Sequence, residues 1–133
     1  MSGLAGNPYA SIVEPVSAYR NKSVSPSEVT KAQLARIDVL DTKLGSYQTI
    51  YSDEALAAAK VADEAFTEDS HLGPFHGIPF ALKDIYELKG QITTCGSYEM
   101  RQRISTETGT LVRRLLEAGG IAIGKTKTVE CAL

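Results

Sequence analysis

The sequence contains no tryptophan, only two cysteines and two histidines, and no apolar run long enough to cross a membrane. Fourteen basic residues stand against sixteen acidic ones, which gives a net charge of -2 at pH 7. Binding to nucleic acid or to an anionic membrane usually comes with an excess of lysine and arginine, which is missing here. The first fifteen residues lack the basic start and apolar core of a secretory leader. We therefore expect a soluble, cytoplasmic protein that binds neither nucleic acid directly nor membranes.

The cysteines and histidines argue against a metal centre. Cys95 and Cys131 lie far apart in the sequence and form no C-x-x-C motif. This spacing favours two free, buried thiols over a disulfide or a metal site. His71 and His76 stand in a turn-rich stretch with no companion ligand at metal-binding spacing, which is typical of surface or loop histidines. The cysteines and histidines therefore predict no metal centre.

The chain has 133 residues, which is the length of a typical single domain. Helical signals dominate its first half. Ser25, Pro26 and Glu28 form a capping-box sequence, and Gly45 follows the last apolar position of the segment they open. The pattern predicts a helix over residues 25–45. A second amphipathic helix is expected from residue 52 to residue 66, and residues 46–52 between them are typical of a short strand or an extended connector.

The second half carries two short apolar segments, residues 78–82 and 121–123. Because both are apolar along their whole length, they predict buried strands that are covered on both faces. A helix over residues 108–118 is expected between them, from leucine and valine at helical spacing. The order of helices, strand, helix and strand is an α/β pattern. Two strands are too few for a stable sheet, so the sequence predicts a fragment of a larger fold.

The stretch "GGIAIGKT", residues 119–126, matches the phosphate-loop pattern G-x-x-x-x-G-K-[ST]. A phosphate loop needs a strand before the first glycine and a helix after the lysine, whereas here the helix comes first. Ile121 and Ile123 are β-branched and favour a strand over a phosphate nest. A nucleotide site is therefore the weaker interpretation, and a helix, a glycine turn and a strand the stronger one.

Lys83 is the candidate for chemistry, because it directly follows the apolar segment 78–82. In α/β folds the crevice at the carboxyl ends of the strands is where sites form. Position alone is weak evidence, because most lysines at strand ends are solvated and Asp84 offers a simple surface partner. Lys125 and Lys127, which flank a turn after residues 121–123, are interpreted as solvated or structural residues.

Two long blocks of the sequence supply stronger evidence. Residues 73–97 read "GPFHGIPFALKDIYELKGQITTCGS", and residues 111–132 read "LVRRLLEAGGIAIGKTKTVECA". They resemble the amidase signature family, whose members carry G-P-L-x-G-I-P-x-x-V-K-D, then T-T-x-G-S, then A-G-A-x-x-x-G-K-T-N. The resemblance implies that residues 1–133 are the N-terminal part of one amidase-signature domain. A helical region, 1–70, would precede the start of an α/β core, 71–133, with the first strands of a mixed sheet covered by helices.

The family's Ser-cisSer-Lys triad is expected to include Lys83, which matches the lysine of the K-D block. The resemblance implies that a neutral Lys83, desolvated in a pocket, accepts a proton from a serine that in turn deprotonates the nucleophilic serine. Amide hydrolysis would then proceed through an acyl-enzyme without metal or organic cofactor. Both serines belong to a Gly/Ser-rich block that follows the G-K-T block, so the 133 residues alone are expected to be inactive. Ser97 belongs to a different block and is interpreted as structural.

The resemblance leaves several alternatives open. The A-subunit of the glutamyl-tRNA(Gln) amidotransferase shares the same blocks, a non-catalytic interaction module would keep the fold without the serines, and a P-loop-like nucleotide binder is the third. Lys127 stands where the family commonly has asparagine, which puts the subfamily in doubt. The expected partners are a small-molecule amide and the remainder of the amidase domain, in the same chain or in a companion fragment. A homodimer is one option for the oligomeric state.

Overall fold

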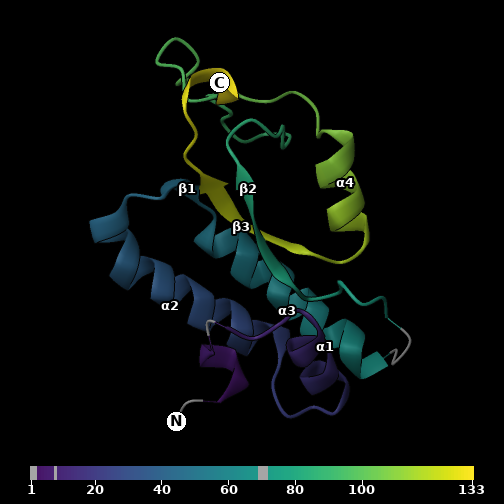
Figure 1. The fold of residues 1–133 in the computed structure, drawn as a ribbon. Helices are drawn as coiled ribbons and strands as arrows, with labels where there is room; N and C mark the ends of the chain where they lie inside the picture. Colours follow the sequence, from purple (N-terminus) through teal and green to yellow (C-terminus); the bar gives the residue numbers. More distant parts are fainter. Residues whose placement is uncertain (1–2, 8, 69–71) are drawn as a thin grey trace.

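The computed structural model describes residues 3–7, 9–68 and 72–133 and shows helices packed against a small mixed sheet (Figure 1). The elements, in chain order, are η1 (Leu4–Gly6), α1 (Val13–Arg20), α2 (Pro26–Leu44), β1 (Tyr47–Ile50), α3 (Ser52–Glu68), β2 (Pro79–Lys83), α4 (Thr110–Glu117), β3 (Ile121–Thr126) and η2 (Glu130–Ala132). The α/β class expected from the sequence is confirmed.

Helix α2 is defined at both ends by the residues that the sequence pattern identified. The Ser25 side chain accepts a hydrogen bond from the Glu28 N–H at 3.2 Å, and the Glu28 carboxylate accepts one from the Ser25 N–H at 2.8 Å. These reciprocal bonds satisfy two N–H groups that a helix start otherwise leaves unpaired. At the other end Gly45 adopts the left-handed conformation, with φ of 58°. The capped helix predicted from the sequence is therefore confirmed.

The three strands lie in the order β1-β3-β2, so the strand that comes last in the sequence occupies the centre. β3 pairs in parallel with β2 and antiparallel with β1. The backbones of β1 and β3 approach closely at Gly124, where an added Cβ would lie 2.4 Å from the Thr49 carbonyl oxygen. Glycine at this position is thus a packing requirement of the sheet.

The main core lies between β3 and the helix pair α2 and α3, which run side by side below the sheet in Figure 1. Small residues on α3 let the helix approach β3 closely. The buried residues of this core are Ile37, Ala55, Ala59, Ala62, Ile121 and Ile123. Helix α4 lies on the other side of β2 and β3 in the same view. A second cluster joins α1, α2 and the residue before β2 through Val16, Tyr19, Val29 and Ile78.

The two strands predicted to be buried on both faces differ in the structure. β3 is central and mostly buried, and it runs three residues beyond the predicted end, through Gly124, Lys125 and Thr126. β2 occupies the edge of the sheet, and Ala81 and Lys83 are exposed while Leu82 between them is buried. The prediction of cover on both faces is therefore wrong for β2, because the described residues leave the face that Ala81 and Lys83 share uncovered.

The structure also shows the surroundings of the two cysteines and of His76. Cys95 and Cys131 are free, as expected, but Cys95 is only partly buried and Cys131 is exposed, so their predicted burial is wrong. The Cys131 N–H donates to the Cys95 carbonyl oxygen at 2.7 Å. His76 lies in the turn before β2, whereas His71 falls outside the described residues. Within the described part of the chain, none of the helices has the length and apolar character that crossing a bilayer requires.

Candidate active site

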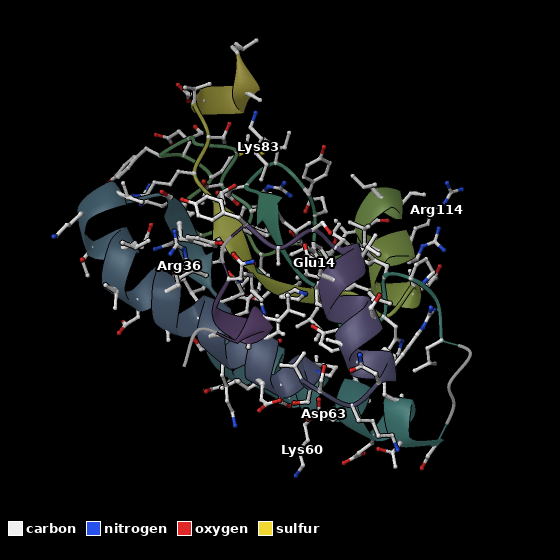
Figure 2. All side chains as sticks on the ribbon, turned by 60° about the horizontal axis from the view of Figure 1, so that its bottom comes forward. Glu14, Arg36, Lys60, Asp63, Lys83 and Arg114 are labelled. Carbon is white, nitrogen blue, oxygen red and sulfur yellow. The ribbon has the colours of Figure 1, made fainter. Side chains whose placement is uncertain are left out.

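Lys83 is the last residue of β2, opposite Thr126 in the parallel register with β3. Its side chain is exposed, whereas Leu82 and Asp84 on either side are buried. Successive residues of a strand point to opposite faces, so Lys83 projects from one face of the sheet and Asp84 from the other. Figure 2 shows Lys83 near the C-terminal turn, far from Lys60 and Asp63 on α3. The described residues leave this amine in contact with solvent, so they do not supply the desolvated pocket that the sequence analysis expected.

The backbone on both sides of Lys83 is held by hydrogen bonds. The Lys83 carbonyl oxygen accepts from the N–H groups of Ile85 and Tyr86, at 2.7 and 3.0 Å. The Asp84 N–H donates to the Thr126 carbonyl oxygen at 2.9 Å. The chain therefore leaves the sheet in a tight turn directly after Lys83, which fixes the direction in which its side chain starts.

Asp84, the residue that follows Lys83 in the sequence, forms an ion pair with Lys125 of β3. The Lys125 Nζ lies 3.5 Å from the Asp84 Oδ1, and the two side chains are 0% and 1% exposed. Burial lowers the pKa of Lys125, and the Asp84 carboxylate opposes that shift. A buried charge of this kind persists only where a partner and further hydrogen bonds replace the lost water.

Two consecutive threonines supply those hydrogen bonds. The Asp84 carboxylate accepts from the Thr94 N–H at 3.2 and 3.3 Å and also from the Thr94 hydroxyl. The Lys125 ammonium donates to the Ile92 carbonyl oxygen at 2.9 Å and to the Thr93 hydroxyl. Each threonine therefore serves one partner of the ion pair, which explains why the chain has two of them in succession.

The loop that carries these threonines is tied to its own return segment. The Thr93 hydroxyl lies 2.7 Å from the Ser105 hydroxyl, and both side chains are buried. Backbone bonds join Thr93 N–H to the Arg103 carbonyl oxygen at 3.0 Å and Ser105 N–H to the Gln91 carbonyl oxygen at 2.9 Å. A paired loop of this kind holds the Thr93 and Thr94 hydroxyls in place for the ion pair.

We call Asp84, Thr93, Thr94, Ser105 and Lys125 the buried polar cluster. It joins the three sequence blocks that contain K-D, T-T and G-K-T, which lie far apart along the chain. The sequence interpretation of Asp84 as a surface partner of Lys83 is wrong, and Lys125 proves to be structural and not solvated. The available signal was that Lys125 continues a strand that is apolar on both faces, where a charge requires a buried partner.

The groups around the cluster are also titratable. Burial, followed by the nearby Asp84 and Glu54 carboxylates, raises the pKa of Tyr51 to about 12, so its hydroxyl keeps its proton. Arg103 forms an ion pair with Glu87, and its hydrogen bond lowers the pKa of Glu87. At neutral pH, Tyr51 is therefore uncharged and Glu87 is a paired carboxylate.

The structure also shows where the residues of the phosphate-loop pattern and Ser97 lie. Helix α4 precedes the glycines and β3 runs through Gly124, Lys125 and Thr126, so the lysine lies within a strand and does not open a helix. Because the Lys125 ammonium is buried against Asp84 and Thr93, it is not free to bind a phosphate. Ser97 is mostly buried, and its N–H donates to the Thr94 carbonyl oxygen at 2.9 Å in the turn after the threonine pair.

Comparison with known proteins identifies the family. The sequence model described as Amidase matches residues 28–133. The chain therefore belongs to the amidase family, as the resemblance of its three blocks implied. Among curated relatives, the A-subunit of the glutamyl-tRNA(Gln) amidotransferase of Geobacter sulfurreducens is 43% identical over 112 residues, which cover 84% of this chain and 23% of the relative.

Solved structures agree with this assignment. The native peptide amidase of Stenotrophomonas maltophilia superposes with a TM-score of 0.85 at 30% identity, over 92% of this chain and 26% of that one. A fatty acid amide hydrolase superposes with a TM-score of 0.83 at 27% identity, over 90% of this chain and 21% of that one. The 133 residues thus span about a quarter of the length of the proteins that they resemble.

Proposed function

We propose that this chain supplies the general base, Lys83, of an active site that hydrolyses a carboxylic amide to an acid and ammonia or an amine. The observation that supports the proposal is the position of Lys83. It ends a parallel strand, its backbone is held on both sides, and its amine is exposed at the carboxyl end of the sheet. This is the edge at which α/β folds place their reacting groups.

In the proposed mechanism, the neutral Lys83 amine takes a proton from the hydroxyl of a serine held by a cis peptide bond. That serine takes the proton of a second serine, whose oxygen attacks the amide carbonyl carbon. Backbone N–H groups hold the oxyanion while the C–N bond breaks, and the leaving nitrogen takes up a proton. Water then hydrolyses the acyl-serine and releases the acid. Protein outside these 133 residues, in the same chain or in a companion, would contribute both serines.

The proposal extends to the organisation of the chain. Residues 1–70 would form a helical region and residues 71–133 the start of the α/β core of one amidase domain. β1 lies in the first of these parts and pairs with β3 in the second, so the sheet draws on both. The small-molecule amide and the remaining part of the domain are the proposed partners, with no metal or organic cofactor in the reaction.

The test replaces Lys83 in the complete polypeptide encoded by the source gene. Lys83→Ala is expected to abolish amide hydrolysis while the far-ultraviolet circular dichroism spectrum stays unchanged, because the substitution removes the proton acceptor of the proposed mechanism. Lys60→Ala removes an exposed lysine from α3, at the other end of the molecule (Figure 2), and is the matched control with unchanged turnover. Near-normal turnover by folded Lys83→Ala protein would remove the basis for the proposal.

A second candidate function follows from the curated relatives. The Geobacter sulfurreducens protein is named as the A-subunit of a glutamyl-tRNA(Gln) amidotransferase, and its identity to this chain is 43%. On this alternative the substrate amide is that of glutamine, and the released ammonia passes to a glutamyl-tRNA bound by other subunits. Ammonia release from glutamine that rises when partner subunits and glutamyl-tRNA are added would favour the amidotransferase. Turnover of other small amides without partners would favour a free-standing amidase.

A further inference from the structure

We infer that the buried Asp84–Lys125 pair is a positioning element for Lys83, which fixes the end of β2 and cancels an Asp84 charge that, without a partner, would favour the protonated form of the Lys83 amine. The inference rests on the proposed function of Lys83 as a base. It assigns to Lys125 and Asp84 a role that goes beyond holding the fold together.

Asp84 holds the end of β2 in place through hydrogen bonds. Asp84 is the residue directly after Lys83, and its carboxylate, its N–H and its carbonyl oxygen are all engaged. The carboxylate is held by Thr94, the N–H by Thr126 and the carbonyl oxygen by the Cys95 N–H at 2.9 Å. Asp84 therefore cannot rotate without breaking bonds to two other segments, and the Cα position of Lys83 is fixed with it.

Lys125 also compensates the charge of the Asp84 carboxylate. A lysine acts as a base only when it is neutral, and a nearby carboxylate without a partner stabilises the protonated form. Asp84 carries such a carboxylate one residue away, facing the buried side of the sheet. The Lys125 ammonium, 3.5 Å from it, makes the pair neutral overall, so the field that reaches Lys83 is that of a dipole and not of a full charge.

Other charged groups surround the pair and have to be considered. Tyr51 and Glu54 lie on the side of β1 and α3, and Glu87, Cys95 and Arg103 lie on the loops that follow β2. Glu87 is neutralised by Arg103, and Tyr51 stays protonated up to high pH. Replacing Lys125 therefore changes the local charge in a defined direction, toward one uncompensated carboxylate.

The expected size of the effect follows from Coulomb's law. Side chains of consecutive strand residues lie on opposite faces, which places the Lys83 amine and the Asp84 carboxylate on the order of 10 Å apart. At that separation and an effective dielectric constant of about 20 to 40, one unit charge shifts a titration midpoint by roughly half to one pH unit. The shift should shrink as salt is added, because Lys83 is exposed to solvent.

The experiment follows the Lys83 amine directly by nuclear magnetic resonance of lysine labelled with ¹³C at Cε, in the complete polypeptide at low salt between about pH 8 and 11, the range around the ordinary lysine pKa. Comparison with Lys83→Arg assigns the signal. The Lys125→Met variant is expected to raise the titration midpoint of Lys83 by about half to one pH unit. The double variant Asp84→Asn/Lys125→Met should return it to the parent value. Lys60→Met, which removes a positive charge from α3, is the matched control and should leave the midpoint unchanged.

The inference is overturned if folded Lys125→Met protein titrates like the parent, or if the double variant shifts as far as the single one. Lys125→Gln, whose amide can still donate to the Ile92 carbonyl oxygen, replaces Lys125→Met if the latter does not fold. In the complete polypeptide, the acid limb of the pH profile of kcat/KM should move upward with Lys125→Met and return in the double variant. Loss of turnover in Lys83→Ala with no such shifts would retain the proposed function and reject the inference. Normal turnover in Lys83→Ala would reject the proposed role of Lys83 as the base. The resonance titration would still measure how the Asp84–Lys125 pair affects the Lys83 amine.

Discussion

Replacing Lys125 by methionine tests how much the buried pair contributes to stability. The substitution leaves the Asp84 carboxylate buried with Thr94 as its donor, and it leaves the Ile92 carbonyl oxygen and the Thr93 hydroxyl without the ammonium. Removing one partner of a buried ion pair costs about 3–5 kcal/mol, of which each lost hydrogen bond contributes about 1 kcal/mol. Single domains unfold with about 5–15 kcal/mol, so Lys125→Met in the complete polypeptide should remove a large part of the free energy of unfolding.

The double variant Asp84→Asn/Lys125→Met separates the two contributions. It removes the uncompensated charge but does not restore the hydrogen bonds that Lys125 made. We therefore expect the free energy of unfolding to fall by only about 2 kcal/mol. Urea unfolding at pH 7, followed by circular dichroism, measures both variants, and Lys60→Met should stay within about 0.5 kcal/mol of the parent. The reasoning is refuted if Lys125→Met unfolds at the parent's urea concentration, or if adding Asp84→Asn lowers stability further.

Three further perturbations test other parts of the fold. Gly124→Ala should destabilise by about 1–3 kcal/mol in urea, because the new Cβ would lie 2.4 Å from the Thr49 carbonyl oxygen; an unchanged midpoint would contradict the close approach of β1 and β3. Ser25→Ala should cost about 1 kcal/mol through loss of the α2 cap, and the same cost in a Glu28→Ala background would show that the box is not reciprocal. Burial lowers the pKa of His76, so the unfolded chain binds a proton at a higher pH than the folded one. The free energy of unfolding should therefore fall as pH drops below about 6.5, and His76→Leu should show a smaller fall; equal slopes would show that His76 does not contribute.

The parts of the fold that the sequence predicted well are those set by local chemistry. The α2 cap depends on Ser25 and Glu28, which are three residues apart, and the turn after α4 depends on Gly119, whose φ is 87°. Such signals act within one turn of the chain and need no knowledge of the tertiary structure. The position of Lys83 at a strand end was predictable for the same reason.

The buried polar cluster was not predictable in this way. Whether Lys125 faces solvent or the core depends on Asp84 and Thr93, which are brought to it by pairing of β3 with β2 and by the loop that carries the threonines. Residue type alone favours a solvated lysine, because lysine is rarely buried without a partner. The exposure of Ala81 and Lys83 was not predictable either, since it depends on which face of β2 the rest of the described chain covers.

The order of the sheet has a consequence for how the chain acquires its structure during synthesis. β1 and β2 are both made before β3, yet in the described part of the chain they do not pair with each other, and β3 is the strand to which both bond. Helices α2 and α3 contain local contacts and can form as they leave the ribosome, whereas the strands must wait for Ile121–Thr126. The Asp84–Lys125 ion pair next to Lys83 can form only when this segment is present. The geometry of the strand end thus forms late, after most of these residues have been translated.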